Sequence, residues 1–165
     1  MSKGITKLQE ERKFIKKSGS LANIGGTAGP INGDYYHWKA SFVGPNNTPY
    51  SGGLFYIEFK FNDQYPDSGP IDVQMRTPTY HPNIWCANGH VCDTYFSEWK
   101  NTNNIVGIVN TVFDLLSEES PTNGYHDHDK NKAANFKNQY AYENQTFDWN
   151  NCWNKGWTEK KIKKY

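Results

Sequence analysis

The sequence predicts a single domain of the α+β class. Its 165 residues suit one compact core. Segments with helical periodicity lie on either side of a block in which apolar and polar residues alternate. This order indicates helices grouped against an antiparallel meander. Because we find no internal repeat and no domain boundary, we expect one domain over residues 1–165.

The first element predicted is an amphipathic helix over residues 3–17. Ile5, Leu8 and Ile15 recur at helical spacing, and either Arg12 or Phe14 completes the apolar face. Glycine and proline residues between positions 18 and 33 are too frequent for a second helix. Within this stretch the run AGPI can begin a strand.

Three further strands are predicted by alternating residues over 35–44, 53–61 and 71–77. Short connections join them, which favours an antiparallel meander of four strands when the AGPI strand is included. Periodicity is lost between positions 78 and 104, and a long irregular stretch in a small domain is usually a functional loop. Apolar spacing then predicts a buried central helix over 105–117 and a polar helix over about 129–142.

Composition excludes some classes of partner. The formal net charge is +1, which provides no overall field to attract nucleic acid or an anionic membrane. We find no signal-peptide pattern and no run of 18 apolar residues, so we expect an intracellular protein, cytoplasmic or nuclear. Three cysteines are an odd number, which argues against a disulfide framework and predicts at least one free thiol.

Three sequence blocks carry a specific resemblance. They are YYHWKASFVGPNNTPYSGGLFYIEFKFNDQYP, TPTYHPNI and GHVC, in that order. Together they resemble the catalytic domain of ubiquitin-conjugating enzymes over about residues 4–142, with 143–165 as an extension. The resemblance implies the fold of that family, no cofactor, and a thioester intermediate. It also implies three partners: ubiquitin or a ubiquitin-like modifier, its activating enzyme, and a ligase.

The resemblance assigns roles to three residues. Cys92, the last residue of GHVC, is the expected nucleophile, because a thiolate attacks a thioester readily and leaves readily when an amine attacks. Asn83 can donate to the oxyanion of the tetrahedral intermediate or hold the loop in shape. Asn123 falls near the position that orients the attacking lysine. An amide cannot act as a base, so another group must remove the proton, with His126, Asp127 and His128 as candidates.

Departures from the family pattern also lead to expectations. Asp93 follows the cysteine, where a carboxylate should disfavour the thiolate. Asp67 stands where the family often has an apolar residue that docks ligases, and Lys100 follows the loop residue Trp99. Loss of an apolar anchor predicts weak or altered engagement of ordinary ligases. Lys3 and Lys7 suit contact with the activating enzyme.

Two rival interpretations remain open. Cys86, His90 and Cys92, with His81 upstream and His126 and His128 downstream, have the right side chains for a metal site, although their spacing is not that of a zinc finger. The other rival is a non-catalytic ubiquitin-binding adaptor with the same fold. Such relatives characteristically lack the cysteine, which this chain retains.

Overall fold

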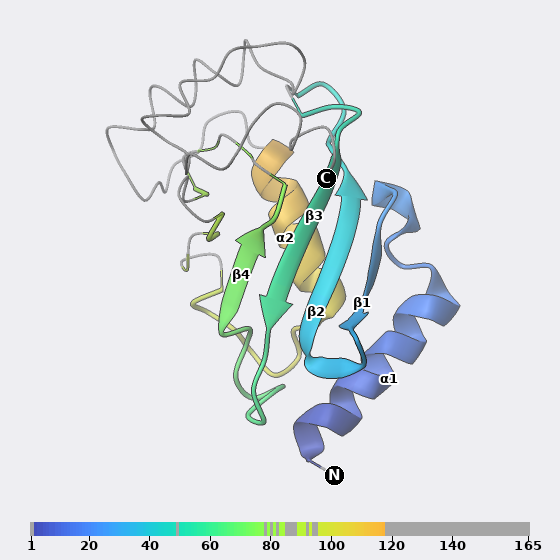
Figure 1. Ribbon diagram of the computed structural model, residues 1–165, viewed down its shortest axis with the longest axis vertical. Coiled ribbons are helices and arrows are strands. Elements are labelled where there is room, and N and C mark those ends of the chain that lie inside the picture. Colours follow the sequence, from blue (N-terminus) through green and yellow to red (C-terminus); the bar gives the residue numbers. More distant parts are fainter. Residues whose placement is uncertain are drawn as a thin grey trace.

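A computed structural model describes residues 2–48, 50–77, 79, 81, 83–84, 89–91, 93 and 96–117. In this part of the chain an N-terminal helix precedes a four-stranded sheet, and a second helix follows it (Figure 1). The elements are α1 (Lys3–Ser18), the short 3-10 helix η1 (Ala22–Ile24), β1 (Thr27–Ile31), β2 (Asp34–Val43), β3 (Leu54–Lys60), β4 (Asp72–Met75) and α2 (Ile105–Ser117). The predicted α+β order is confirmed. The helix predicted over 129–142 lies outside the described residues, and the single domain over 1–165 stays a prediction.

Helix α1 follows the predicted bounds closely. Ser2 caps it, because its Oγ accepts the N–H of Ile5 at 3.1 Å. The prediction that Phe14 could complete the buried face is wrong, since this side chain is 57% exposed. Glu11 lies three residues after buried Leu8 and four before buried Ile15, so the geometry of the helix turns its side chain inward despite its charge. The buried face is formed by Gly4, Leu8, Glu11 and Ile15.

The sheet is an antiparallel meander in the order β1-β2-β3-β4, as predicted. Asn32 and Gly33 join β1 to β2 with positive φ angles of 51° and 78°, the backbone that a tight two-residue hairpin requires. The register of β2 and β3 pairs Trp38 with Phe59 and Phe42 with Phe55. Aromatic side chains from both strands therefore lie on one face of the sheet.

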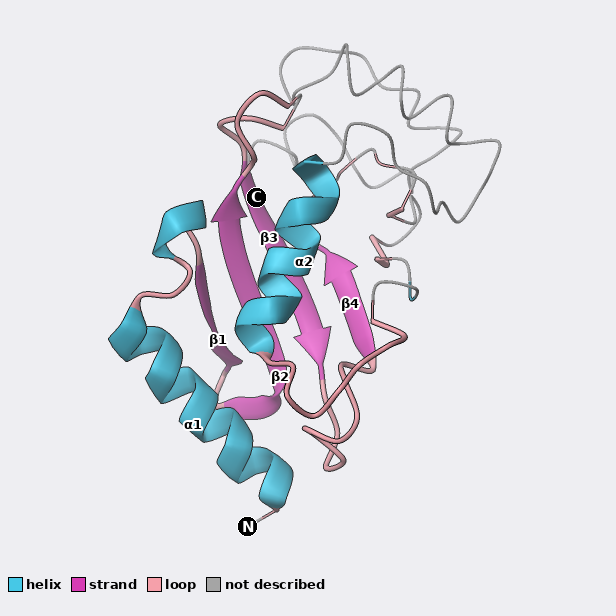
Figure 2. Ribbon diagram, turned by 180° about the vertical axis from the view of Figure 1, so that it is seen from behind, coloured by secondary structure: helices cyan, strands magenta, loops and turns pink. Residues whose placement is uncertain are grey.

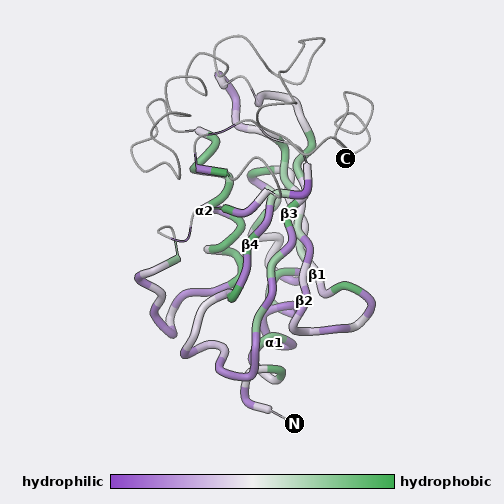
Figure 3. Tube along the Cα trace, turned by 60° about the vertical axis from the view of Figure 1, so that its left-hand side comes forward, coloured by the Kyte–Doolittle hydropathy of each residue, from purple (hydrophilic) through white to green (hydrophobic). Residues whose placement is uncertain are grey.

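Helix α2 crosses this aromatic face (Figure 2). The helix is coloured mostly as hydrophobic in Figure 3, in keeping with its buried position. Phe113 is half-buried and meets Phe42 edge-on at 5.7 Å between ring centres. The fully buried side chains of this layer are Trp38, Phe42, Phe55, Ile57, Phe59 and Met75 of the sheet and Ile105, Ile108, Val109, Val112, Leu115 and Leu116 of α2.

The opposite face of the sheet carries charged residues, and no described helix covers it (Figures 1 and 2). The Oε2 atom of Glu58 lies 3.0 Å from the Nε2 atom of His37, and its Oε1 atom lies 3.7 Å from the Nε atom of Arg76. Lys60 lies opposite Asp72 in the register of β3 and β4. β4 is the last strand in the sheet order, and the irregular segment follows it in the chain.

Candidate functional site

The short segment of residues 89–91 pairs with β4 and extends the sheet beyond it. The N–H of Met75 donates to the carbonyl oxygen of Gly89 at 2.7 Å, and the N–H of Val91 donates to that of Val73 at 2.9 Å. Gly89 has a φ of +81°, and a Cβ atom there would lie 2.0 Å from the carbonyl oxygen of Met75. Only glycine fits this approach, which explains the glycine of GHVC.

A second contact joins the two sequence blocks that carry the resemblance. Ile84, the end of TPTYHPNI, forms an antiparallel bridge with Val91 of GHVC. Both side chains are buried in the core, at 3% and 1% exposure. Apolar burial thus holds the chain just after Asn83 against the chain just before position 92.

Asn83 is fully buried. Its backbone N–H donates to the Nδ1 atom of His81 at 3.1 Å. Among the described residues neither the Oδ1 nor the Nδ2 atom of its side-chain amide has a hydrogen-bond partner. A buried amide left in this state costs on the order of 1–3 kcal/mol. Such a group calls for a physical explanation, for example a catalytic role or a bound water.

His81 holds the turn that presents Asn83. Its carbonyl oxygen accepts the N–H of Ile84 at 3.1 Å, and its ring lies 6.2 Å from the ring of Tyr50. Its Nδ1 atom accepts a backbone N–H and so carries no proton. These contacts indicate that His81 shapes the turn.

Two of the three predicted site residues, Cys92 and Asn123, lie outside the described residues. The same holds for His126, Asp127 and His128, and for Cys86 of the possible metal site. Among described side chains, no group of three or more His, Cys, Asp or Glu could hold a metal ion. The assignments of Cys92 and Asn123 therefore stay predictions.

The structure adds a feature that the sequence did not indicate. His90 lies between two carboxylates: its Nδ1 atom is 2.9 Å from Oδ1 of Asp72, and its Nε2 atom is 2.8 Å from Oδ1 of Asp93. The carboxylate that follows the predicted nucleophile thus has a histidine partner. Only the tertiary structure brings Asp72 to His90, because β4 and the irregular segment pair side by side.

Glu11 is a second buried polar group that sequence reasoning missed. Its Oε1 atom accepts the N–H of Ile105 at 2.8 Å, and its Oε2 atom accepts the hydroxyl of Tyr65. Burial raises the pKa of Glu11 above its ordinary value of 4.5, against the opposing effect of both hydrogen bonds. Burial also raises the pKa of Tyr65, which keeps the phenol protonated as a donor. The spacing of Leu8 and Ile15 could have revealed this inward position.

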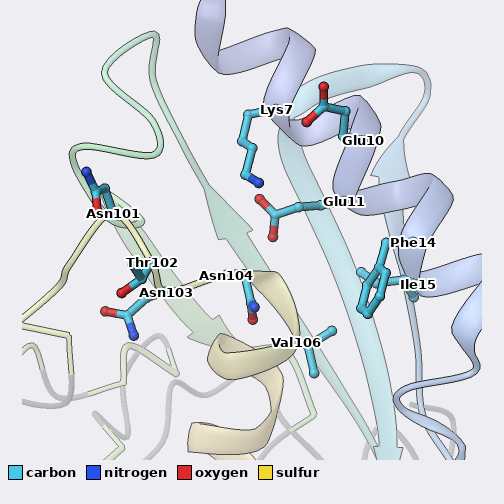
Figure 4. Close-up of a pocket in the computed structure, with 10 residues that line it drawn as sticks. All are labelled: Lys7, Glu10, Glu11, Phe14, Ile15, Asn101, Thr102, Asn103, Asn104 and Val106. Carbon is cyan, nitrogen blue, oxygen red and sulfur yellow. The ribbon is translucent and has the colours of Figure 1, made fainter.

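A cavity of about 540 Å³ lies between α1, the loop of residues 101–104 and the start of α2. Figure 4 shows Lys7 and Glu11 projecting from α1 toward the loop. Lys3 and Lys7 are the two lysines predicted to meet the activating enzyme. Lys7 lines this cavity, and the Nζ atom of Lys3 lies 3.6 Å from the Oδ2 atom of Asp67. Both side chains of the Lys3–Asp67 pair are largely exposed, so the pair adds little stability.

Trp99 is anchored to the loop that carries Asp67. Its indole N–H donates to the carbonyl oxygen of Pro66 at 2.8 Å, and its ring lies 6.0 Å from that of Tyr65. Lys100, the next residue, is exposed. The family resemblance implies ligase docking at Asp67 and at the chain after Trp99. The Trp99–Pro66 hydrogen bond brings these two positions close together, and each carries a charged residue, Asp67 and Lys100.

No described helix combines the length and apolar character needed to cross a bilayer.

Comparisons with known proteins agree with this architecture. The family model described as ubiquitin-conjugating enzyme matches residues 7–150. The human ubiquitin-conjugating enzyme E2 G1 is similar in structure, with a TM-score of 0.63, 28% identity, and coverage of 70% of this chain and 96% of that one. A putative ubiquitin conjugating enzyme from Plasmodium yoelii has a TM-score of 0.65 and 25% identity, and the match covers 86% and 97% of the two chains. The chain belongs to the ubiquitin-conjugating enzyme family.

Proposed function

We propose that this chain is an active ubiquitin-conjugating transferase with Cys92 as its nucleophile. The Cys92 thiolate attacks the thioester carbonyl that links ubiquitin to the activating enzyme. A new thioester forms on Cys92, and the thiol of the activating enzyme is released. A lysine amine, or the cysteine of a ligase, then attacks this thioester and expels the Cys92 thiolate, and an attacking amine loses its proton to solvent or a nearby base.

The observation that carries this proposal is the Ile84–Val91 bridge beside the buried Asn83 amide, which has no hydrogen-bond partner among the described residues. Asn83 precedes Ile84 in the chain and Cys92 follows Val91. Antiparallel register continued by one residue on each strand would set Cys92 opposite Asn83. The Nδ2 group of Asn83 could then donate to the oxyanion that forms at the acyl carbon, a use that accounts for an amide buried without a described partner.

The first experiment incubates the full chain with ubiquitin, the activating enzyme and ATP, and compares gels with and without reductant. A conjugate that reductant removes is expected for the wild type. Cys92→Ser should replace it with a reductant-resistant ester or with no conjugate, while the matched variant Cys152→Ser should form the thioester normally. A thioester that persists in Cys92→Ser would overturn the assignment.

The same assay separates the enzyme from the adaptor alternative. An adaptor would bind ubiquitin but form no reducible conjugate with any activated modifier. The cysteine within GHVC favours the enzyme. Thiol chemistry of this kind also suits the reducing interior of a cell, in the cytoplasm or the nucleus.

We further propose that Asn123 helps to orient the attacking lysine. Its amide oxygen can accept a hydrogen bond from an amine. Asn123→Ala should therefore charge normally on Cys92 but discharge more slowly to free lysine. Unchanged discharge would remove Asn123 from the amine site.

A further inference from the structure

We propose that Tyr65 and Glu11 are positioning residues for partner docking. Their hydrogen bond holds helix α1 and two loops, the first loop of residues 62–69 and the second loop of residues 99–104, together as one preformed surface. The proposal rests on the proposed function, because the partner concerned is the activating enzyme that charges this chain. Tyr65 and Glu11 are buried, at 1% and 7% exposure, so they act through the exposed residues that they hold in place.

The hydroxyl of Tyr65 ties the first loop to α1. It donates to the Oε2 atom of Glu11, and burial raises the pKa of Tyr65, so the phenol stays protonated as a donor. The backbone of the loop also lies against the helix, since a Cβ atom added at Gly4 would lie 3.0 Å from the carbonyl oxygen of Tyr65. Helix α1 and the first loop are therefore in close contact through both backbone and side chains.

The second loop is fixed at both of its ends. The indole N–H of Trp99, its first residue, donates to the carbonyl oxygen of Pro66 in the first loop at 2.8 Å. The N–H of Ile105, the residue after the loop, donates to the Oε1 atom of Glu11 at 2.8 Å. Glu11 thus binds the first loop with one carboxylate oxygen and the end of the second loop with the other.

Exposed residues of this surface come from all three segments. Lys3 belongs to α1, Asp67 to the first loop and Lys100 to the second loop. The Nζ atom of Lys3 lies 3.6 Å from the Oδ2 atom of Asp67, but the two side chains are 77% and 63% exposed, so this ion pair adds little stability. The relative positions of these residues therefore depend mainly on the buried contacts of Tyr65 and Glu11.

Loss of the Tyr65 hydroxyl should loosen α1 from the first loop. A buried carboxylate oxygen of Glu11 would lose its donor, which favours a movement of the two segments that lets water reach it. A partner that spans both segments would then have to order them on binding, and such ordering lowers affinity. The expected effect is weaker docking with unchanged chemistry at the nucleophile.

The first measurement is the affinity of the full chain for the activating enzyme, by biolayer interferometry without ATP, so that no ubiquitin is transferred. Tyr65→Phe removes only the hydroxyl, and its Kd should rise about three- to tenfold. In the charging assay the KM for this chain should rise by a similar factor while kcat stays unchanged. Discharge of the charged protein to free lysine, which involves no activating enzyme, should also stay unchanged.

Variants of Glu11 show whether the two residues act through one hydrogen bond. Glu11→Gln retains an oxygen for the N–H of Ile105 and an N–H group that can donate to the phenol oxygen, so it should bind like the wild type. Glu11→Ala removes both contacts and should weaken binding at least as much as Tyr65→Phe. In the double variant, Tyr65→Phe should add no further loss to that of Glu11→Ala. Circular dichroism at the assay temperature checks folding; if Glu11→Ala is not folded, the contrast between Tyr65→Phe and Glu11→Gln decides.

Tyr35→Phe is the matched control. The hydroxyl of Tyr35 accepts a hydrogen bond from the Nη1 atom of Arg12 at 3.3 Å. This change therefore also removes a hydroxyl contact of α1, but one that is made to β2 rather than to a loop. The Kd of Tyr35→Phe should match that of the wild type.

An unaltered Kd in Tyr65→Phe, an equal loss of affinity in Tyr35→Phe, or slower discharge to lysine in Tyr65→Phe would overturn the proposal. So would additive losses in the double variant, or a wild type that does not bind the activating enzyme. A wild type that binds the activating enzyme and is never charged would instead contradict the proposed function, and the Kd values would still decide this proposal.

Discussion

The carboxylate of Glu11 on α1 accepts a hydrogen bond of 2.8 Å from the backbone N–H of Ile105, the first residue of α2, 94 residues later in the chain. The first N–H groups of a helix lack partners within the helix. Glu11 supplies one from another element and also places a negative charge at the positive end of the α2 dipole. The hydroxyl of Tyr65 donates to the other carboxylate oxygen. Glu11 therefore joins both helices to the loop after β3.

Glu11→Ala should destabilise the protein by about 2 kcal/mol or more. The change removes the acceptor of the Ile105 N–H at the start of α2. It also leaves the hydroxyl of Tyr65, a side chain 1% exposed, without its acceptor. Urea unfolding followed by circular dichroism measures the loss. Glu10→Ala, at the neighbouring exposed position, should change stability far less; equal effects of the two variants would show that the buried contacts carry little energy.

Glu11→Gln should gain stability relative to the wild type as the pH rises. The pKa of Glu11 is raised in the folded state by burial, so the folded protein binds this proton more tightly than the unfolded chain does. The contribution of Glu11 to stability is therefore fully present below about pH 4.5, the ordinary value, and is lost as the pH rises through the folded-state pKa. Glutamine keeps an acceptor for Ile105 and does not titrate.

Urea unfolding of both proteins between about pH 4 and pH 8 checks this sign. The stability difference between Glu11→Gln and the wild type should increase over the lower part of the range and then level off. Glu10→Gln controls for the removal of a negative charge from α1. A difference that stays flat with pH, or that falls, would contradict the raised pKa.

Gly89→Ala should destabilise the segment that leads to Cys92 by about 2–4 kcal/mol and abolish charging. An added Cβ would lie 2.0 Å from the carbonyl oxygen of Met75. Gly33→Ala is the matched control, because Gly33 has a similar φ of +78° but nothing within 4 Å of an added Cβ. It should cost only about 1 kcal/mol and leave charging intact. Denaturant unfolding and the thioester assay together compare the two.

Asn83→Ala should slow discharge of the charged enzyme to lysine by roughly 10²–10³-fold, the effect of losing one oxyanion donor. Stability should change by less than about 1 kcal/mol or rise, because the side-chain amide has no partner among the described residues. Single-turnover discharge and urea unfolding measure the two effects. A large loss of stability with a matching loss of charging would assign Asn83 a structural role instead.

Asp67→Phe should strengthen stimulation by RING ligases by roughly tenfold, if an apolar anchor is what this surface lacks. Asp67 is exposed and its only described ion pair is the weak one with Lys3. Asp63→Phe, in the same loop and also exposed, controls for a general gain in hydrophobic character. Full stimulation of the wild type by an ordinary ligase would show that the charged residue does not impair docking.

Much of the fold could be predicted from local pattern. Alternation over 35–44 and 53–61 located β2 and β3 within one residue of their observed ends, because each strand buries one face and period two follows directly from that. The apolar spacing of 105–117 located α2 at its observed bounds. Phe14 is hydrophobic, but the geometry of the helix places it outside the buried face of α1.

The sequence alone determined the order of the elements, the buried sides of β2, β3 and α2, and the family whose signature blocks the chain carries, since these follow from spacing along a single segment. The tertiary structure alone decided that Glu11 accepts the first N–H of α2, that Ile84 meets Val91 beside a buried Asn83, and that His90 lies between Asp72 and Asp93. Each of these contacts joins residues that no local period relates. Their physical cause is the burial and pairing of whole elements, which sets the partners of polar side chains only once the core has formed.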